Sequence, residues 1–277
     1  MNNAKLTEQL MCLILWCIAL FVVVVPIAML YELLTQGLSH LSWAFLFSEP
    51  LNSGRNGGIA PILLSTALIL MTCLSVVIPI GLSCALYITE VCDRNSFIGK
   101  WLSHSLDILG GVPSIVFGLF GYVFFAQILS LGFSILTGGL TLACMALPLF
   151  IRLCEQALRN SPVSYRQAAQ ALNLSHSGYI LHILLPSASS GIAAATIIAT
   201  GRALAETAVL IFTAGYASRY PASIMDSGRA LSVHIYDLAM NVAGGTKPAA
   251  ATALVLVTLL IIINISARYF SKRWLPR

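Results

Sequence analysis

Long stretches with almost no charged residues set the first limit on what this chain can fold into. Residues 10–34 contain one charged side chain, Glu32. About 20 consecutive apolar residues let a helix cross the hydrocarbon core of a bilayer. A cleaved signal peptide has a shorter apolar core followed by a small-residue cleavage site. We therefore expect a retained membrane helix here, after a short cytoplasmic N-terminus at residues 1–9.

The rest of the chain repeats this pattern. Hydrophobic residues make up 58% and charged residues 9% of the 277 residues, whereas about one quarter of a soluble domain is charged. So few charges cannot cover a surface that faces water, so we predict an all-α protein in the lipid bilayer, with one transmembrane domain at residues 10–270. The predicted spans are residues 10–34, 59–89, 101–131, 137–153, 184–215 and 248–269.

The lysines and arginines indicate the orientation, because they are enriched in cytoplasmic loops. With the N-terminus inside, the cytoplasmic side holds Lys5, Arg94, Lys100, Arg152, Arg159, Arg166, Arg268, Lys272, Arg273 and Arg277. The outer side holds Arg55, Arg219, Arg229 and Lys247, and Arg202 falls within a span. We expect both termini, a polar segment at 155–181 and a basic tail at 271–277 in the cytoplasm. The basic residues are too scattered to predict nucleic-acid binding.

Neither a metal site nor a catalytic centre is indicated. The seven cysteines show no C-x-x-C spacing, and the pattern suits small apolar core residues better than a disulfide framework or a metal site. Paired acids and a histidine cluster are lacking, which disfavours a membrane enzyme.

Small residues recur where helices are expected to pack closely. Gly111, Ser114, Gly118 and Gly121 follow one another at steps of three, four and three in the third span. Such spacing would place them on one helical face, where a second helix can approach. Gly201 and Ala205 would belong to a similar seam in the fifth span. A pore lining is the alternative for the third span.

One pair of charges lies inside a predicted span. Arg202 and Glu206 are four residues apart, so they are expected to share a helical face. Arg202 is sixteen residues after Pro186, or about 24 Å along a helix, in the outer half of the bilayer. Charges at such depth suggest function. Arginine suits an oxyanion because its planar fork donates two hydrogen bonds. The alternative is a structural salt bridge that locks two helices together.

The polar segment contains a predicted helix–turn–helix. Ser161 is expected to cap the first helix, with Pro162 at its first position. Asn173 is expected to end this helix in the left-handed conformation, and Ser175 to cap the next. The exposed, alanine-rich face suits docking into a shallow groove of another protein, although a plain connecting loop is the alternative.

This segment resembles the cytoplasmic motif of bacterial ABC importer permeases, E-A-A, then glycine, then I-x-L-P. The matching positions are Gln167, Ala168, Ala169, Asn173, Ile183, Leu185 and Pro186. Glutamine replaces the motif's glutamate and asparagine replaces its glycine. Asparagine tolerates the left-handed region, so the turn is expected to survive, whereas the lost charge affects one contact to the partner.

Two further runs resemble the PstA-type permeases of phosphate importers. They are residues 110–121 (GGVPSIVFGLFG) and 202–208 (RALAETA), the latter followed by FTAG at 212–215. Ala205 stands where this family usually has glycine. We expect Arg202, Glu206 and Thr207 of this run to lie on the substrate path, and the residues of the cytoplasmic motif to dock the ATP-binding subunits.

The resemblance implies a type I (MetI-like) permease fold in a bacterial inner-membrane importer. Its partners would be a sister permease (PstC-type), two ATP-binding subunits (PstB-type) and a periplasmic phosphate-binding protein (PstS-type). The chain has no G-x-x-x-x-G-K-[ST] loop, so the partners would use the ATP and Mg²⁺, and this chain is expected to bind no cofactor and to be no enzyme. Import of another oxyanion or a phosphonate is one alternative, and an ion-gradient-driven transporter is another.

Overall fold

A computed structural model describes residues 2–92 and 96–274, and most of them are helical. Five helices in this part of the chain are long and apolar enough to cross a membrane: Thr7–Gly37, Ala60–Val91, Ile135–Arg159, His176–Ala205 and Thr246–Ser266. A bent pair, Phe97–Gly111 with Ser114–Ile128, is the sixth candidate span. The predicted all-α membrane fold is confirmed. Of the residues used above, Arg94 and Arg277 lie outside the described part.

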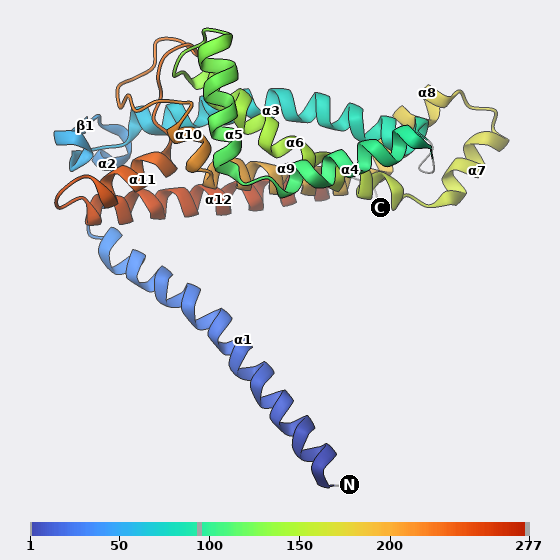
Figure 1. Ribbon diagram of the computed structural model, residues 1–277, viewed down its shortest axis with the longest axis horizontal. Coiled ribbons are helices and arrows are strands. Elements are labelled where there is room, and N and C mark those ends of the chain that lie inside the picture. Colours follow the sequence, from blue (N-terminus) through green and yellow to red (C-terminus); the bar gives the residue numbers. More distant parts are fainter. Residues whose placement is uncertain (1, 93–95, 275–277) are drawn as a thin grey trace.

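The α-helices and β-strands are labelled in chain order in Figure 1. They are α1 (Asn2–Gly37), α2 (Trp43–Phe47), β1 (Pro50–Leu51), β2 (Asn56–Gly57), α3 (Ala60–Leu86), α4 (Phe97–Gly111), α5 (Ser114–Gly121), α6 (Ile135–Arg159), α7 (Val163–Ala171), α8 (His176–Tyr179), α9 (Leu185–Ala205), α10 (Ala208–Ile211), α11 (Leu231–Met240) and α12 (Thr246–Trp274). Strands β1 and β2 pair antiparallel, with Pro50 opposite Gly57. Short π-helical turns extend three helices: Tyr87–Val91 after α3, Tyr122–Ile128 after α5 and Ile180–Leu184 before α9.

Helix α6 is the centre of the bundle. In the most apolar 18-residue stretch of α6, 67% of the residues are buried. The corresponding share is 39% for the span that contains α3 and 28% for the span that contains α9. Glycines let α3 and α6 approach closely: a Cβ on Gly139 would overlap Thr72, and one on Gly81 would overlap Phe150. Phe150 is fully buried at this contact. The helices that carry the polar ends described below are therefore held in a rigid frame.

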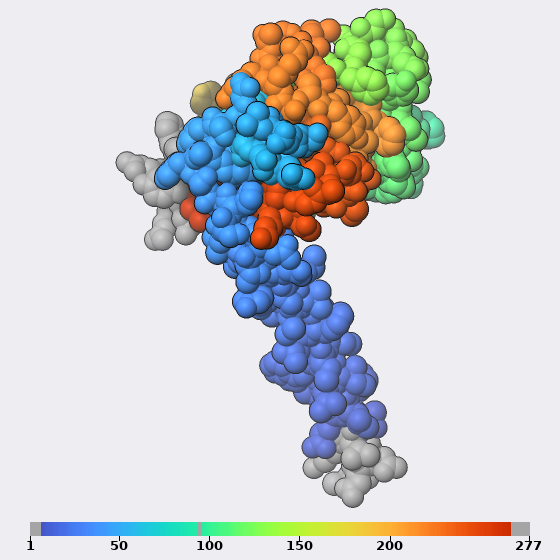
Figure 2. Space-filling view, turned by 90° about the vertical axis from the view of Figure 1, so that its left-hand side faces the viewer, coloured from blue at the N-terminus to red at the C-terminus, as the bar shows by residue number. Residues whose placement is uncertain are grey.

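Helix α1 extends away from the other helices (Figures 1 and 2). None of its most apolar window is buried. Its last residue touches the body, because Gly37 lies against Ala250 and Leu254 of α12. The apolar side chains of residues 10–31 are exposed.

The third predicted span, 101–131, is not one straight helix. Helix α4 and the α5 segment are bent by 97° relative to each other. Pro113 lacks an N–H and holds Val112 in an extended conformation (ψ 131°), as expected of a residue before proline. Gly111 therefore ends one helix and Ser114 begins the next. The prediction that Gly111, Ser114, Gly118 and Gly121 share one helical face is wrong.

The fifth predicted span, 184–215, ends earlier than expected. Helix α9 ends at Ala205, and Glu206 is extended (φ −76°, ψ 125°). The chain then forms the short helix α10 and a turn at Gly215, which has a φ of +91°. Helix α11, β1 and β2 lie at one end of the body, and α7 lies at the opposite end (Figure 1).

Candidate functional site

Helix α7 projects from one end of the bundle on two turns that the sequence specifies. Pro162 is its N-terminal flanking residue, and no side chain caps this end; the predicted cap by Ser161 is wrong, because its Oγ lies 2.8 Å from Ser187 Oγ instead. Asn173 has a φ of 50°, which confirms the predicted left-handed turn. Ser175 caps α8 through Gly178 N–H, as expected.

The structure separates the predicted docking residues into an outer and an inner group. Gln167, Ala168, Asn173 and Pro186 are exposed. Ala169 is 3% exposed and packs into the main core, so its side chain holds α7 in place and offers no free surface. Ile183 and Leu185 are half-buried against the same core. The outer group is therefore open to a docking partner, whereas the inner group mainly holds α7 and the start of α9 against the core.

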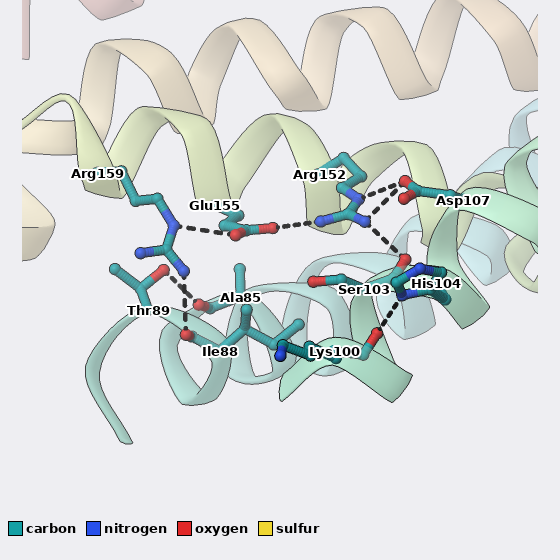
Figure 3. A network of polar contacts seen from close by, with 10 residues as sticks. All are labelled: Ala85, Ile88, Thr89, Lys100, Ser103, His104, Asp107, Arg152, Glu155 and Arg159. Atoms are coloured by element: carbon teal, nitrogen blue, oxygen red, sulfur yellow. Dashed lines mark hydrogen bonds and ion pairs between the residues drawn. The ribbon is translucent and has the colours of Figure 1, made fainter. Parts of the chain in front are cut away.

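Three charged residues of α6 form a polar network at this end of the bundle (Figure 3). Glu155, whose side chain is 7% exposed, accepts hydrogen bonds of 2.9 Å from both Arg152 and Arg159. Arg152 also reaches α4, with Nη2 2.7 Å from Asp107 Oδ1. Arg159 donates to the carbonyl of Ile88 beyond α3. One buried carboxylate thus organises the ends of α3, α4 and α6.

A pocket of ≈ 240 Å³ adjoins this network and α7. Its lining comprises Thr89, Glu90, Leu158, Arg159, Ser161, Pro162, Val163, Arg166, Tyr179 and Leu184. Glu90, on the π-helical turn after α3, pairs with Arg166 of α7 at 3.5 Å, and its side chain is 4% exposed. The Glu90 carboxylate is therefore almost completely buried between the end of α3 and α7.

Sequence reasoning used these charges for orientation and missed the network. The spacing of Arg152, Glu155 and Arg159 at i, i+3 and i+7 was an available signal, because it places all three on one helical face. The partners Asp107 and Ile88 lie 45 and 71 residues away along the chain. No spacing rule joins residues so far apart.

The predicted pair in the fifth span is not formed. Glu206 lies beyond the end of α9, so it does not share a helical face with Arg202, and no ion pair among the described residues joins them. The Glu206 carbonyl instead accepts a 2.7 Å hydrogen bond from Ser232 Oγ. Arg202 is exposed on α9, and Thr207 follows the break. Arg202 faces away from this chain's own core.

Only some of the residues predicted to pack closely against another helix do so. Gly118 lies against the backbone of Val209, and a Cβ on Gly121 would overlap Thr141. Gly111 has no atom within 4 Å of such a Cβ, Gly201 has only Leu260 at 3.9 Å, and Ala205 is exposed. Most α9 residues that are buried are small ones on another face, Ala188, Ala195, Ala199 and Ala203, and Thr200 and Leu204 are buried as well.

Comparison with known proteins identifies the family. Residues 77–276 match the family described as binding-protein-dependent transport system inner membrane component. The chain belongs to this family. It is 28% identical to a probable ABC transporter permease, YqgI, of Bacillus subtilis, over 96% of each chain. It is 31% identical to the phosphate transport system permease PstA of Yersinia pestis, over 88% of this chain and 83% of that one.

A solved structure supports the fold of this permease. A chain of a bacterial alginate ABC transporter, in complex with a pentasaccharide-bound periplasmic protein, superposes with a TM-score of 0.67 at 17% identity, over 98% of this chain and 96% of that chain. The permease is a multi-pass protein of the inner membrane, and its family has no ATPase site of its own. In the described part of the permease, no group of three His, Cys, Asp or Glu residues is arranged to hold a metal ion.

Proposed function

We propose that this permease moves inorganic phosphate from the periplasm to the cytoplasm by alternating access, as a subunit of an ATP-driven importer. The observation that carries the proposal is the exposed helix α7 with its left-handed turn at Asn173, which matches the docking motif of importer permeases. Family membership favours ATP-driven import over the ion-gradient alternative. Phosphate is supported by relatives named as phosphate permeases, such as the one from Yersinia pestis.

We assign three exposed surfaces of the permease to partner proteins of the importer. We assign α7 to one of two ATP-binding subunits (PstB-type), which would place α7 and both termini in the cytoplasm. The opposite end, with α11 and the β1–β2 hairpin, would then meet a periplasmic phosphate-binding protein (PstS-type). The apolar surface of α1, whose most apolar 18 residues are not buried by the described part of the chain, would pack against a sister permease (PstC-type).

Arg202 is the residue that we assign to the anion path. Its side chain is exposed on α9, beside Ile198, which is 49% exposed, and Ala205. A cation on an outward face within the bilayer needs a partner surface or a water-filled path. A sister permease across this face would enclose such a path, and Arg202 would attract the oxyanion with its two parallel donors. Thr207 and Glu206, at the break after α9, would lie beside it.

Uptake of labelled phosphate tests this assignment in cells that lack their own high-affinity importer. The cells would carry the permease and its partners, as wild type, Arg202→Gln or the charge-retaining control Arg202→Lys. We expect saturable uptake that Arg202→Gln abolishes and Arg202→Lys partly keeps, with equal co-purification of the ATP-binding subunits. Undiminished uptake by Arg202→Gln would remove Arg202 from the path. An assembled wild-type complex that takes up no phosphate would favour the other oxyanions.

A further inference from the structure

Glu90 and Arg166 join a membrane span to α7. Glu90 lies on the π-helical turn after α3, and its Oε2 is 3.5 Å from Nη2 of Arg166 on α7. The Glu90 side chain is 4% exposed, whereas that of Arg166 is 50% exposed. Arg166 provides the only ion pair of Glu90 in the described part of the chain. Since a buried carboxylate is costly without a cation, positions of α7 that keep Arg166 beside Glu90 are favoured.

The contact is incomplete, and space lies next to it. Glu90 Oε2 is buried and accepts no hydrogen bond. The same carboxylate lines the pocket of ≈ 240 Å³ between the end of α3, the end of α6 and α7. A buried acceptor without a donor costs free energy, and the open volume leaves α7 room to approach. Movement of α7 toward the span would shorten the ion pair, and movement away would leave Glu90 unpaired.

The ion pair lies beside one end of a row of alternating charges. Asp107, Arg152, Glu155 and Arg159 are joined in that order by ion pairs of 2.7, 2.9 and 2.9 Å. Arg159 lines the pocket together with Glu90. It also donates a hydrogen bond to the carbonyl of Ile88, which lies two residues before Glu90. The row therefore runs from the bent span at α4, through α6 and the end of α3, to α7.

We propose that Glu90 and Arg166 are positioning residues that couple displacement of α7 to the membrane spans. The proposal rests on the proposed function, in which ATP-binding subunits dock on α7. Their closure displaces α7, and the Glu90–Arg166 pair transmits the displacement to the end of α3. The network around Glu155 then carries it to α6 and α4. Without the pair, α7 moves without the spans, and ATP is hydrolysed without import.

The test measures ATP hydrolysed per phosphate imported by the complete importer in proteoliposomes. The variants are Glu90→Gln, Arg166→Gln, their combination, and Arg166→Lys, which keeps the charge. Lys100→Gln is the matched control, because Lys100 is exposed on α4 and has no ion pair among the described residues. We expect each neutral variant to raise the ratio at least about fivefold, the lower end of typical coupling between sites. The double variant should equal the singles, and Arg166→Lys should stay near wild type.

Three results would overturn the proposal: singles with the wild-type ratio, effects that multiply in the double variant, or an equal rise in Lys100→Gln. If Glu90→Gln does not assemble, the comparison of Arg166→Gln with Arg166→Lys decides the question, because Arg166 is half-exposed and its replacement is expected to leave the fold intact. A wild-type complex that imports no phosphate contradicts the proposed substrate instead. In that case the coupling is measured as the increase in ATP hydrolysis that the binding protein causes when it is added with the cargo it was purified with. The neutral variants should lose this increase.

Discussion

Nη2 of Arg152 lies 2.7 Å from Oδ1 of Asp107, a contact that ties α4 to α6 at the α7 end of the bundle. The same guanidinium donates to the Ser103 carbonyl and to Glu155. Arg152 thereby fixes the part of the third span that precedes its 97° bend. The orientation of this bent span depends on a polar contact as well as on apolar packing.

Glu155 is the member of this network whose loss should cost most. Glu155→Ala leaves Arg152 and Arg159 without their shared, nearly buried carboxylate. The arginines left behind are 29% and 32% exposed, and Arg152 keeps Asp107. We therefore expect a loss of about 2 kcal/mol, typical of hydrogen bonds to a charged group, and a lower unfolding temperature in detergent. The control is Glu49→Ala, since Glu49 is exposed and has no ion pair among the described residues. Equal unfolding temperatures for the two variants would contradict the prediction.

Two glycines of the third span should respond differently to alanine. A Cβ at Gly121 would overlap the Thr141 side chain, whereas one at Gly111 would meet nothing within 4 Å. Overpacking a close contact costs about 2 kcal/mol, so Gly121→Ala should lower the thermal stability of the permease and Gly111→Ala should not. The comparison is made on the purified importer complex. A larger loss for Gly111→Ala would refute the bent arrangement.

Asn173 should tolerate glycine but not valine. Its φ of 50° is left-handed, which glycine adopts freely and a β-branched residue adopts at a cost of about 1–2 kcal/mol. We expect Asn173→Val to distort the turn after α7 and to reduce co-purification of the ATP-binding subunits, while Asn173→Gly retains them. Equal retention by the valine variant would show that docking does not need this turn.

His234 should make the α11 end of the permease sensitive to acid. Burial, and secondly Arg229, lower the pKa of His234 to about 4, while Asp237 opposes the shift. Between this value and the ordinary pKa of about 6.5, the unfolded chain binds a proton that the folded chain does not. Stability therefore falls as pH falls through this window.

The variant His234→Gln isolates this effect. Lowering the pH from 7 to 5 should cost the wild type about 2 kcal/mol more than the variant, measured as the change in unfolding temperature at each pH. Because the variant differs from the wild type at this side chain alone, the difference between the two pH slopes reports on His234. The same pH slope in both proteins would exclude His234 as the source.

The apolar runs were sufficient to predict the class of fold, because a bilayer demands long uncharged helices. The turn at Asn173 was predictable from local chemistry. The end of α9 at Ala205 was not, since residues 206–215 continue the apolar run although the chain leaves the helix there. Pro113 marks the bend, but its angle depends on packing against α6 and α10. The network around Glu155 needs residues that only the fold brings together.

The most direct test of phosphate import uses the purified importer, reconstituted with its periplasmic binding protein on one side and ATP on the other. The measurement is labelled phosphate accumulated inside the vesicles with ATP, and with a non-hydrolysable analogue as control. We predict accumulation that requires ATP hydrolysis and the binding protein and that unlabelled phosphate, but not sulfate, suppresses. An assembled complex that hydrolyses ATP in response to the binding protein yet accumulates no phosphate would contradict the account.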